Sequence, residues 1–351
     1  MEGKNDIQDK AVEWYISNEL VYKKLAKKIE NILIEIFNST NVNYHIVTSR
    51  SKDLDSFRKK INNDKYNSPI EQIKDLAGIR IITYVEDEVK IVCKTIENIF
   101  SIDKQHSLDK SKELGIDKFG YKSVHYVASL KKDRLELPEY KIFENKCFEI
   151  QVRTILQHAW AEIEHDRNYK FSGKLPDEIS RRFKLLAGSL EMSDREFNNI
   201  SKEIDIISKE VQIGTKIGKL DFKINSISLK QFIETTFESL ETDKFTIIQK
   251  MGDNIINELN LFGIQTLKDL DDIIPKDLIK ILKINDIKLN GRMTIGGLTR
   301  LILIINDSNK YFFKSWNSEW KYWSRAKNSE NIFKHYGVDV LEIKEKFDVD
   351  L

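Results

Sequence analysis

The fold of this chain is constrained most by the order in which helix-like and strand-like spacings of apolar residues follow one another along the first 211 residues. Apolar residues recur with helical spacing in three long segments, 10–37, 155–170 and 177–211. Short apolar or alternating segments, which are typical of β-strands, lie between the first two: Leu76–Tyr84, Val124–Leu130 and Cys147–Val152. Helices that flank several strands in this order predict an α+β fold, with a mixed sheet covered by helices.

The segments between these elements are assigned from capping residues and polarity. Ser49 has the chemistry of a helix N-cap, and we expect it to begin a helix over 52–61. A further helix is predicted over 89–100. Residues 101–114 are polar and are expected to form a loop.

A length of 351 residues exceeds what one compact core usually needs, so we predict two domains, residues 1–200 and 201–351. Beyond Gly214, helical segments alternate with isolated turn residues, so the second domain is expected to be mostly helical. Its aromatic segment, 311–323, contains Trp316 and Trp320 at helical spacing and is expected to pack inside the domain. A surface for a partner or for nucleic acid stays open as the alternative.

Composition limits the cellular setting and the partners. Cys93 and Cys147 are too few for a disulfide framework or a four-ligand zinc site, so a reducing, cytoplasmic setting is expected. The polar N-terminus and the lack of an apolar run of roughly 20 residues predict neither a signal peptide nor a membrane anchor. Lys and Arg number 57 and Asp and Glu 56, so no global basic field indicates nucleic acid, although a local patch can still bind phosphates.

The segment 147–153 places Glu149, Gln151 and Arg153 on one face of a strand and apolar residues on the other. A carboxylate, an amide and a guanidinium in one row can bind a metal, a base edge and a phosphate, although many solvated strand faces look similar. Asp75 directly precedes another predicted strand, where it can approach this polar face. Because magnesium is usually held by one or two carboxylates plus substrate phosphates, Asp75 and Glu149 suit Mg²⁺; the plain alternative for Asp75 is a cap or turn residue.

Other polar motifs are less specific. Five cations on 49–52 and 58–60 offer point charges and a guanidinium fork to a polyphosphate, or simply a solvated helix face. Gly120 permits close backbone approach and Tyr121 can stack on a base; a hairpin glycine with a core tyrosine is the alternative. His158, Glu162, His165 and Tyr169 share a helix face, but their spacing matches no zinc pattern.

Five segments together resemble the RelA/SpoT-type alarmone synthetase domain: SRSK at 49–52, DLAGIRI at 75–81, GYKSVH at 120–125, EIQVRT at 149–154 and WAEIEHDRNYK at 160–170. The resemblance covers roughly residues 10–200. It implies a nucleotidyltransferase-like mixed sheet and a cytoplasmic enzyme that uses Mg²⁺. That enzyme moves the β,γ-pyrophosphate of ATP to the 3′-hydroxyl of GDP or GTP, and it releases AMP and ppGpp or pppGpp. No hydrolase domain is expected, because the first hundred residues contain a single histidine, His45.

The resemblance also implies residue roles. Arg50 and Lys52 would hold the ATP phosphates, with Lys60 and Arg80 as further ATP contacts. Asp75 would bind magnesium, and Glu149 would either share the metal or take the proton of the attacking hydroxyl. The acceptor side would consist of Gly120, Tyr121, His125, Gln151 and Arg153.

Phe119 departs from the family pattern, because many members have asparagine there, linked to guanine recognition. Stacking alone tolerates any base. A toxin-type enzyme that pyrophosphorylates the 3′ end of tRNA, or adenine nucleotides, therefore stays open, as does an inactive nucleotide-sensing module. Independently of the acceptor, residues 201–351 are expected to bind a regulatory partner or the synthetase domain itself, and a homo-oligomer stays open as well.

Overall fold

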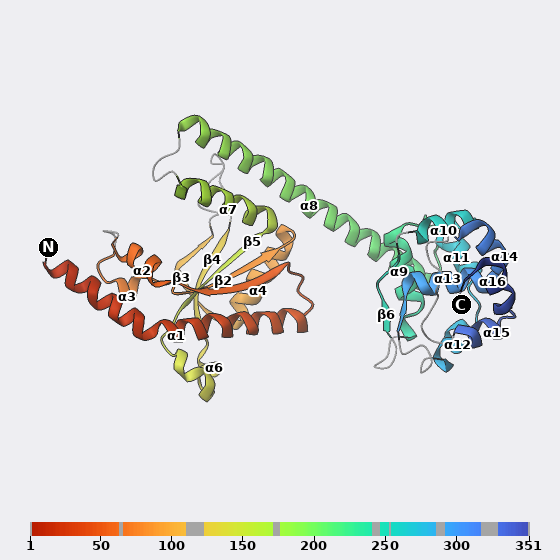
Figure 1. Cartoon of the computed structure of the whole chain (residues 1–351), viewed down its shortest axis with the longest axis horizontal. Helices are drawn as coiled ribbons and strands as arrows, with labels where there is room; N and C mark the ends of the chain where they lie inside the picture. Colours follow the sequence, from red (N-terminus) through yellow and green to blue (C-terminus); the bar gives the residue numbers. More distant parts are fainter. Residues whose placement is uncertain are drawn as a thin grey trace. The chain divides into compact units, whose positions relative to one another are not determined.

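The chain divides into two compact units, Met1–Ser201 and Lys202–Leu351, each with its own hydrophobic core (Figure 1). The structure is a computed structural model that describes residues 2–62, 66–109, 123–170, 176–240, 246–252, 254–285, 292–316 and 329–349. Among these residues, no helix combines the length and the apolar character that a membrane crossing requires.

The first unit is built on a five-stranded mixed sheet in the order β1-β2-β5-β4-β3. Its strands are β1 (Ile46–Ser51), β2 (Ala77–Thr83), β3 (Phe100–Asp109), β4 (Val124–Leu130) and β5 (Phe148–Thr154). Strands β2 and β5 pair in parallel, and the other three pairings are antiparallel. The predicted α+β fold with a mixed sheet is confirmed.

Helices cover both faces of this sheet. The helices that begin in the first unit are α1 (Glu2–Ser39), α2 (Leu54–Ile61), α3 (Pro69–Gln72), α4 (Glu86–Ile99), α6 (Lys132–Leu135), α7 (Ile155–Lys170) and α8 (Asp177–Ile217), with a 3₁₀ turn at Pro138–Phe143. Helices α1 and α4 pack on the apolar face, where Ile79, Ile81 and Ile150 are buried together with Leu33 of α1 and Ile96 of α4. This leaves the opposite, polar face of the sheet for the site.

Two local predictions were wrong, both at strands on the sheet edges. Ser49 does not cap a helix; it lies in β1 opposite Ile79, and Asp53 caps α2 by accepting a hydrogen bond from the Ser56 amide at 2.7 Å. The predicted loop over 101–114 is in part the edge strand β3. The polar sequence of β3 does not indicate a strand, because an edge strand is half exposed to solvent. The pairing of β3 with β4 also shifts register between Asp103 and Leu108.

The second unit is mostly helical, as predicted. Its helices are α9 (Ser226–Thr236), α10 (Ile255–Phe262), α11 (Leu267–Asp272), α12 (Leu278–Ile284), α13 (Ile295–Asn306), α14 (Ser308–Lys310), α15 (Ser329–His335) and α16 (Val340–Phe347), with short turns at Glu238–Leu240 and Tyr311–Ser315. The parallel strands β6 (Thr246–Ile248) and β7 (Arg292–Thr294) form a small second sheet.

The aromatic segment of the second unit forms only one π-helical turn in the described region, and Trp316 follows that turn in an extended conformation. Trp316 is half-buried and packs edge-on against Phe312, so it belongs to the core, whereas Trp320 and Trp323 lie outside the described residues.

A buried ion pair in the second unit was not anticipated from the sequence. Glu258 of α10 is inaccessible to solvent and receives three hydrogen bonds from the Arg300 guanidinium, at 2.6, 2.9 and 3.2 Å. The Tyr311 hydroxyl donates a fourth, at 2.6 Å. A charged residue among apolar neighbours carries no signal in the sequence that reveals its partner.

Candidate active site

Strand pairing aligns the predicted site residues in two rows across the polar face. In one row, Gly78 of β2 lies between Arg50 of β1 and Glu149 of β5. In the next row, Arg80 lies beside Gln151, which in turn pairs with His125 of β4. Because side chains two residues apart on a strand share a face, both rows project from the same side of the sheet.

A small cavity of about 130 Å³ opens over these rows. It is lined by Thr48, Ser49, Arg50, Asp75, Gly78, Ile79, Arg80, Glu149 and Gln151. The cavity therefore brings together five of the residues that the sequence analysis assigned to the site. Gly78 has no side chain, which keeps the space between Arg50 and Glu149 open.

Asp75 is held by two lysines at the edge of this cavity. One carboxylate oxygen, Oδ2, accepts hydrogen bonds from Lys52 Nζ at 2.8 Å and Lys60 Nζ at 2.7 Å. Burial by itself raises the pKa of Asp75, but the hydrogen bonds and charges of the two lysines outweigh burial, and the pKa is lowered overall. Asp75 is thus a carboxylate at neutral pH.

Glu149 is the centre of a hydrogen-bonded chain of polar side chains. Its Oε1 accepts from His125 Nδ1 at 2.8 Å and from the Gln151 amide at 3.4 Å. His125 Nε2 lies 2.8 Å from the Ser123 hydroxyl, so the ring joins Ser123 to Glu149 through its two nitrogens. Burial raises the pKa of Glu149, yet the bond and charge of His125 lower it overall, so Glu149 is also ionised.

Two arginines extend the site toward α7. Arg153 is only 6% exposed and donates to Gln151 Oε1 at 2.5 Å; burial, followed by the nearby Arg80 charge, lowers its pKa. Arg80 pairs with Glu162 of α7 at 2.9 Å. His158 lies 3.6 Å from the same carboxylate, and its pKa is lowered by burial and then by both arginines. The polar stripe predicted on α7 thus contributes Glu162 as a partner for Arg80.

The acceptor residues are only partly within the described structure. His125, Gln151 and Arg153 lie together as above, but Phe119, Gly120 and Tyr121 lie outside the described residues.

Sequence reasoning missed the support that α1 supplies to the donor side. The Tyr15 hydroxyl donates to the Lys52 carbonyl, and the Ser49 hydroxyl donates to the Glu30 carboxylate. Helical spacing predicted α1 only as a core helix, and its periodicity does not distinguish Tyr15 and Glu30 from the other residues of the helix.

The site offers ligands for a magnesium ion. Asp75 Oδ1 is buried and has no hydrogen-bond partner among the described residues, as expected of an oxygen that binds a cation. The described part of the chain contains no cluster of three or more His, Cys, Asp or Glu residues able to hold a metal. A pair of carboxylates that relies on substrate phosphates for the remaining ligands fits the way proteins bind Mg²⁺.

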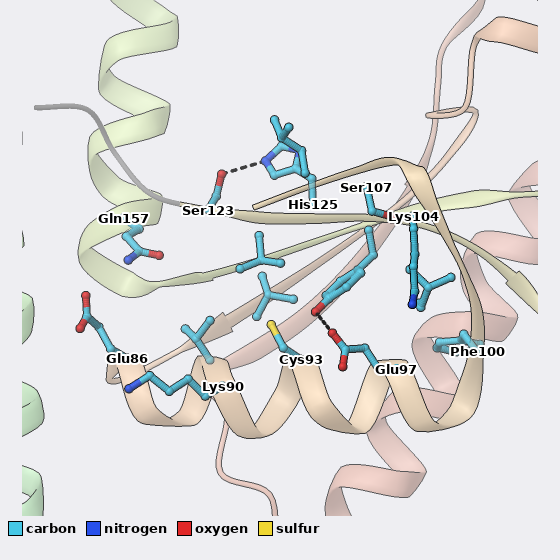
Figure 2. Close-up of a pocket in the computed structure, with 16 residues that line it drawn as sticks. Glu86, Lys90, Cys93, Glu97, Phe100, Lys104, Ser107, Ser123, His125 and Gln157 are labelled. Carbon is cyan, nitrogen blue, oxygen red and sulfur yellow. Dashed lines mark hydrogen bonds between the residues drawn. The ribbon is translucent and has the colours of Figure 1, made fainter. Parts of the chain in front are cut away.

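A larger cavity of about 820 Å³ lies on the other side of the sheet, between α4 and strands β3 and β4 (Figure 2). Cys93, Glu97 and Tyr126 line it, and the Tyr126 hydroxyl donates to Glu97 at 2.7 Å. In Figure 2 the His125 ring lies on the far side of its strand from α4. Because Asp75, Glu149 and Arg50 do not line this space, the smaller cavity is the better candidate for chemistry.

Lys60→Met is expected to weaken the binding of a polyphosphate ligand at this site about tenfold, because a charge-assisted hydrogen bond is worth about 1.5–3 kcal/mol. Lys59→Met, the same change one position earlier on α2, is the matched control. Calorimetric titration of each variant with a nucleoside triphosphate measures both. An equal effect of the two changes would mean that general positive charge, and not the contact of Lys60 with Asp75, matters.

Comparison with known proteins shows what this chain is similar to. A family model described as "Region found in RelA / SpoT proteins" matches residues 49–174. The GTP pyrophosphokinase YjbM of Bacillus subtilis (strain 168) is 28% identical over 162 residues, which cover 45% of this chain and 72% of that protein. The GTP pyrophosphokinase YwaC of the same organism is 30% identical over 146 residues, 38% of this chain and 61% of that protein. Among solved structures, the small alarmone synthetase 1 from Bacillus subtilis has a TM-score of 0.47 at 25% identity, covering 55% of this chain and 98% of that one.

Proposed function

We propose that this chain, whose residues 49–174 form a RelA/SpoT-type synthetase domain, is a magnesium-dependent pyrophosphokinase. It transfers the β,γ-pyrophosphate of ATP to the 3′-hydroxyl of GDP or GTP and so makes ppGpp or pppGpp. The observation that carries this proposal is that Asp75 and Glu149, from separate parts of the chain, line one cavity with two arginines. The similarity to two GTP pyrophosphokinases supports guanine nucleotides as acceptors.

The donor side would be formed by the cations around Asp75. Arg50 and Arg80 line the cavity, and Lys52 and Lys60 reach it through Asp75, so a triphosphate placed there meets four positive charges. Magnesium bound by Asp75 would neutralise the charge that develops on the transferred group. Positioning and charge neutralisation account for most of the catalysis of phosphoryl-type transfer, so no covalent nucleophile is needed.

The acceptor side would be formed around Glu149. The 3′-oxygen of the acceptor attacks the β-phosphorus of ATP, the bond from that phosphorus to the α–β bridging oxygen breaks, and AMP leaves. Glu149 is ionised and fixed by His125, so it can accept the proton that the attacking hydroxyl loses. Gln151 and Arg153 extend the hydrogen-bonded row and would hold the phosphates or the ribose of the acceptor.

For the remainder of the chain we propose a division of labour. Residues 1–200 would act as the synthetase domain, and residues 201–351 as a helical accessory domain. A site with two ionised carboxylates and four cations supports catalysis over a purely sensing role, because a nucleotide sensor has no need of a proton acceptor beside the metal ligand.

The test is incubation of the purified full-length protein with γ-labelled ATP, Mg²⁺ and one acceptor at a time: GDP, GTP, an adenine nucleotide or deacylated tRNA. We expect label in GDP or GTP together with release of AMP, and no label when Mg²⁺ is chelated. Label confined to tRNA or adenine nucleotides would keep the pyrophosphokinase and overturn the guanine acceptor. No label in any acceptor would contradict the enzyme.

A further inference from the structure

The proposed activity does not use the large cavity between α4 and the strands β3 and β4, which we call the α4 cavity (Figure 2). Its volume of about 820 Å³ lies within the range of roughly 300–1,000 Å³ that is typical of small-molecule sites. Arg50, Asp75 and Glu149 do not line it. His125 does, but its ring lies on the far side of β4 and contacts Glu149 there. A ligand in the α4 cavity would therefore be distinct from the proposed nucleotide substrates.

Small apolar side chains form the middle of the α4 cavity. On α4, Val92 is inaccessible to solvent, but Val89 and Cys93, which line the cavity, are only half-buried. Val124 and Val152 form the apolar wall on the sheet. Apolar atoms that border an open space lack the dispersion contacts of a packed core, so an apolar ligand that fills this space is stabilised there.

The Gln157 side chain supplies an unused hydrogen-bond donor to the α4 cavity. Gln157 lines the cavity, is only 7% exposed, and accepts a hydrogen bond from the Thr154 amide through Oε1 at 3.0 Å. That bond fixes which atom of the side-chain amide is the oxygen. The remaining NH₂ group donates to no other residue that the structure describes. A buried donor without an acceptor costs free energy, so the cavity favours a ligand that places an oxygen atom beside Gln157.

A lysine of the α4 cavity is available to an anionic group. Of the described residues, Lys90 and Lys104 are the lysines that line the cavity. Lys90 already pairs with Asp87 at 2.7 Å, whereas Lys104 forms no ion pair with a described residue. In Figure 2 the Lys104 side chain extends from β3 toward α4. One available ammonium group matches a ligand with a single negative charge better than a polyphosphate, which needs several cations.

The two acidic residues of the described lining are already stabilised by other groups. Glu97 accepts a hydrogen bond from the Tyr126 hydroxyl at 2.7 Å. Burial, followed by this bond, raises the pKa of Tyr126, so the hydroxyl stays protonated and continues to donate. Glu86 lies in the first turn of α4, where the helix dipole stabilises a carboxylate. The charge of the lining that still lacks a counter-charge is therefore the positive charge of Lys104.

We propose that the α4 cavity binds a small amphipathic carboxylate, which is a molecule with an apolar chain or ring and one carboxylate group. The apolar part lies against Cys93, Val124 and Val152, and the carboxylate pairs with Lys104. A carbonyl or hydroxyl oxygen at the other end of the molecule accepts a hydrogen bond from Gln157. Burial of the apolar part supplies most of the affinity, and the two polar contacts fix the orientation of the ligand.

The experiment uses decanoate as the probe and decanamide, which has the same chain without the charge, as the control ligand. Calorimetric titration of the full-length protein below the micellar concentration should detect binding of decanoate. Lys104→Met should weaken binding of decanoate about tenfold, because a charge-assisted contact is lost, and should leave binding of decanamide unchanged. Lys94→Met makes the same change at an exposed position of α4 that does not line the cavity, so it should bind both ligands as the wild type does.

Alkylation of the two cysteines locates the bound ligand. Cys93 lines the α4 cavity and Cys147 does not, so decanoate should slow the reaction of Cys93 with N-ethylmaleimide several-fold and leave Cys147 unchanged. Absence of binding, an equal loss of both ligands in Lys104→Met, or an unprotected Cys93 would overturn the proposed site. Retained thermal unfolding of each variant shows that the change acts on binding. Neither measurement requires pyrophosphate transfer, so the α4 cavity is tested separately from the proposed function.

Discussion

Replacing Asp75 by asparagine is expected to slow pyrophosphate transfer roughly a thousandfold or more, because in the proposed site Asp75 supplies both the carboxylate for magnesium and the counter-charge for two lysines. Asparagine keeps the shape of the side chain and removes the negative charge. Lys52 and Lys60 would lose their shared partner, and Oδ1, which is buried and without a hydrogen bond among the described residues, would no longer attract a cation. Single-turnover transfer of label from γ-labelled ATP measures the loss.

The matched control is Asp55→Asn, the same chemical change on α2 at a side chain that is 83% exposed and that forms a long ion pair with Arg58, at 3.8 Å. It should transfer at the wild-type rate. Thermal unfolding of both variants separates chemistry from folding, because Lys52 is only 12% exposed and its unpaired ammonium could destabilise the first unit. A rate for Asp75→Asn within tenfold of the wild type, with a correctly folded protein, would remove Asp75 from the proposed metal site.

Glu258→Leu is expected to destabilise the second unit by about 3–5 kcal/mol, the cost of removing one partner of a buried ion pair. The change preserves most of the volume but leaves the Arg300 guanidinium, 17% exposed, without its bidentate acceptor. Tyr311 loses its acceptor as well. Hydrogen exchange in peptides from α10 and α13 reports the effect within the second unit, which avoids assuming that two units unfold in one step.

The double variant Glu258→Leu/Arg300→Met is the control for this prediction. Replacing both partners of a buried pair by apolar residues is often neutral, so the double variant should recover most of the lost protection. If it is as unstable as Glu258→Leu alone, packing of the new side chain and not the loss of the Glu258–Arg300 pair is the cause. Pyrophosphate transfer should survive in the double variant, because neither residue belongs to the first unit.

Short-range periodicity was sufficient for the central elements of the first unit. The alternation around Glu149, Gln151 and Arg153 predicted which face of β5 is polar, and the structure agrees because Phe148, Ile150 and Val152 are fully buried. The same reasoning found β2 and β4, as well as helices α7 and α8. In each case the residues of one element carry the signal, because burial of one face selects side chains at a fixed spacing.

Edge strands are where local reasoning failed. Ser49 is as suitable for an N-cap as for a strand, and its place in β1 is decided by hydrogen bonds to β2, which follows much later in the chain. The prediction of a loop at the segment that forms β3 was wrong for the same reason, because the strand conformation of this segment depends on pairing with β4. Backbone hydrogen bonds between strands form with almost any side chain, so the composition of an edge strand does not indicate that it is a strand.

The sequence by itself determined the chemical types at the site and the faces on which they lie: two carboxylates, an amide and several cations on polar strand faces. Only the tertiary structure decided that Asp75 and Glu149 share one cavity, because parallel pairing of β2 with β5 is a contact between distant segments. Tertiary structure also decided the partners of the charges, such as Lys52 and Lys60 on Asp75, His125 on Glu149 and Arg300 on Glu258. Coulomb and hydrogen-bond energies depend on distances in space, which spacing along the chain does not encode.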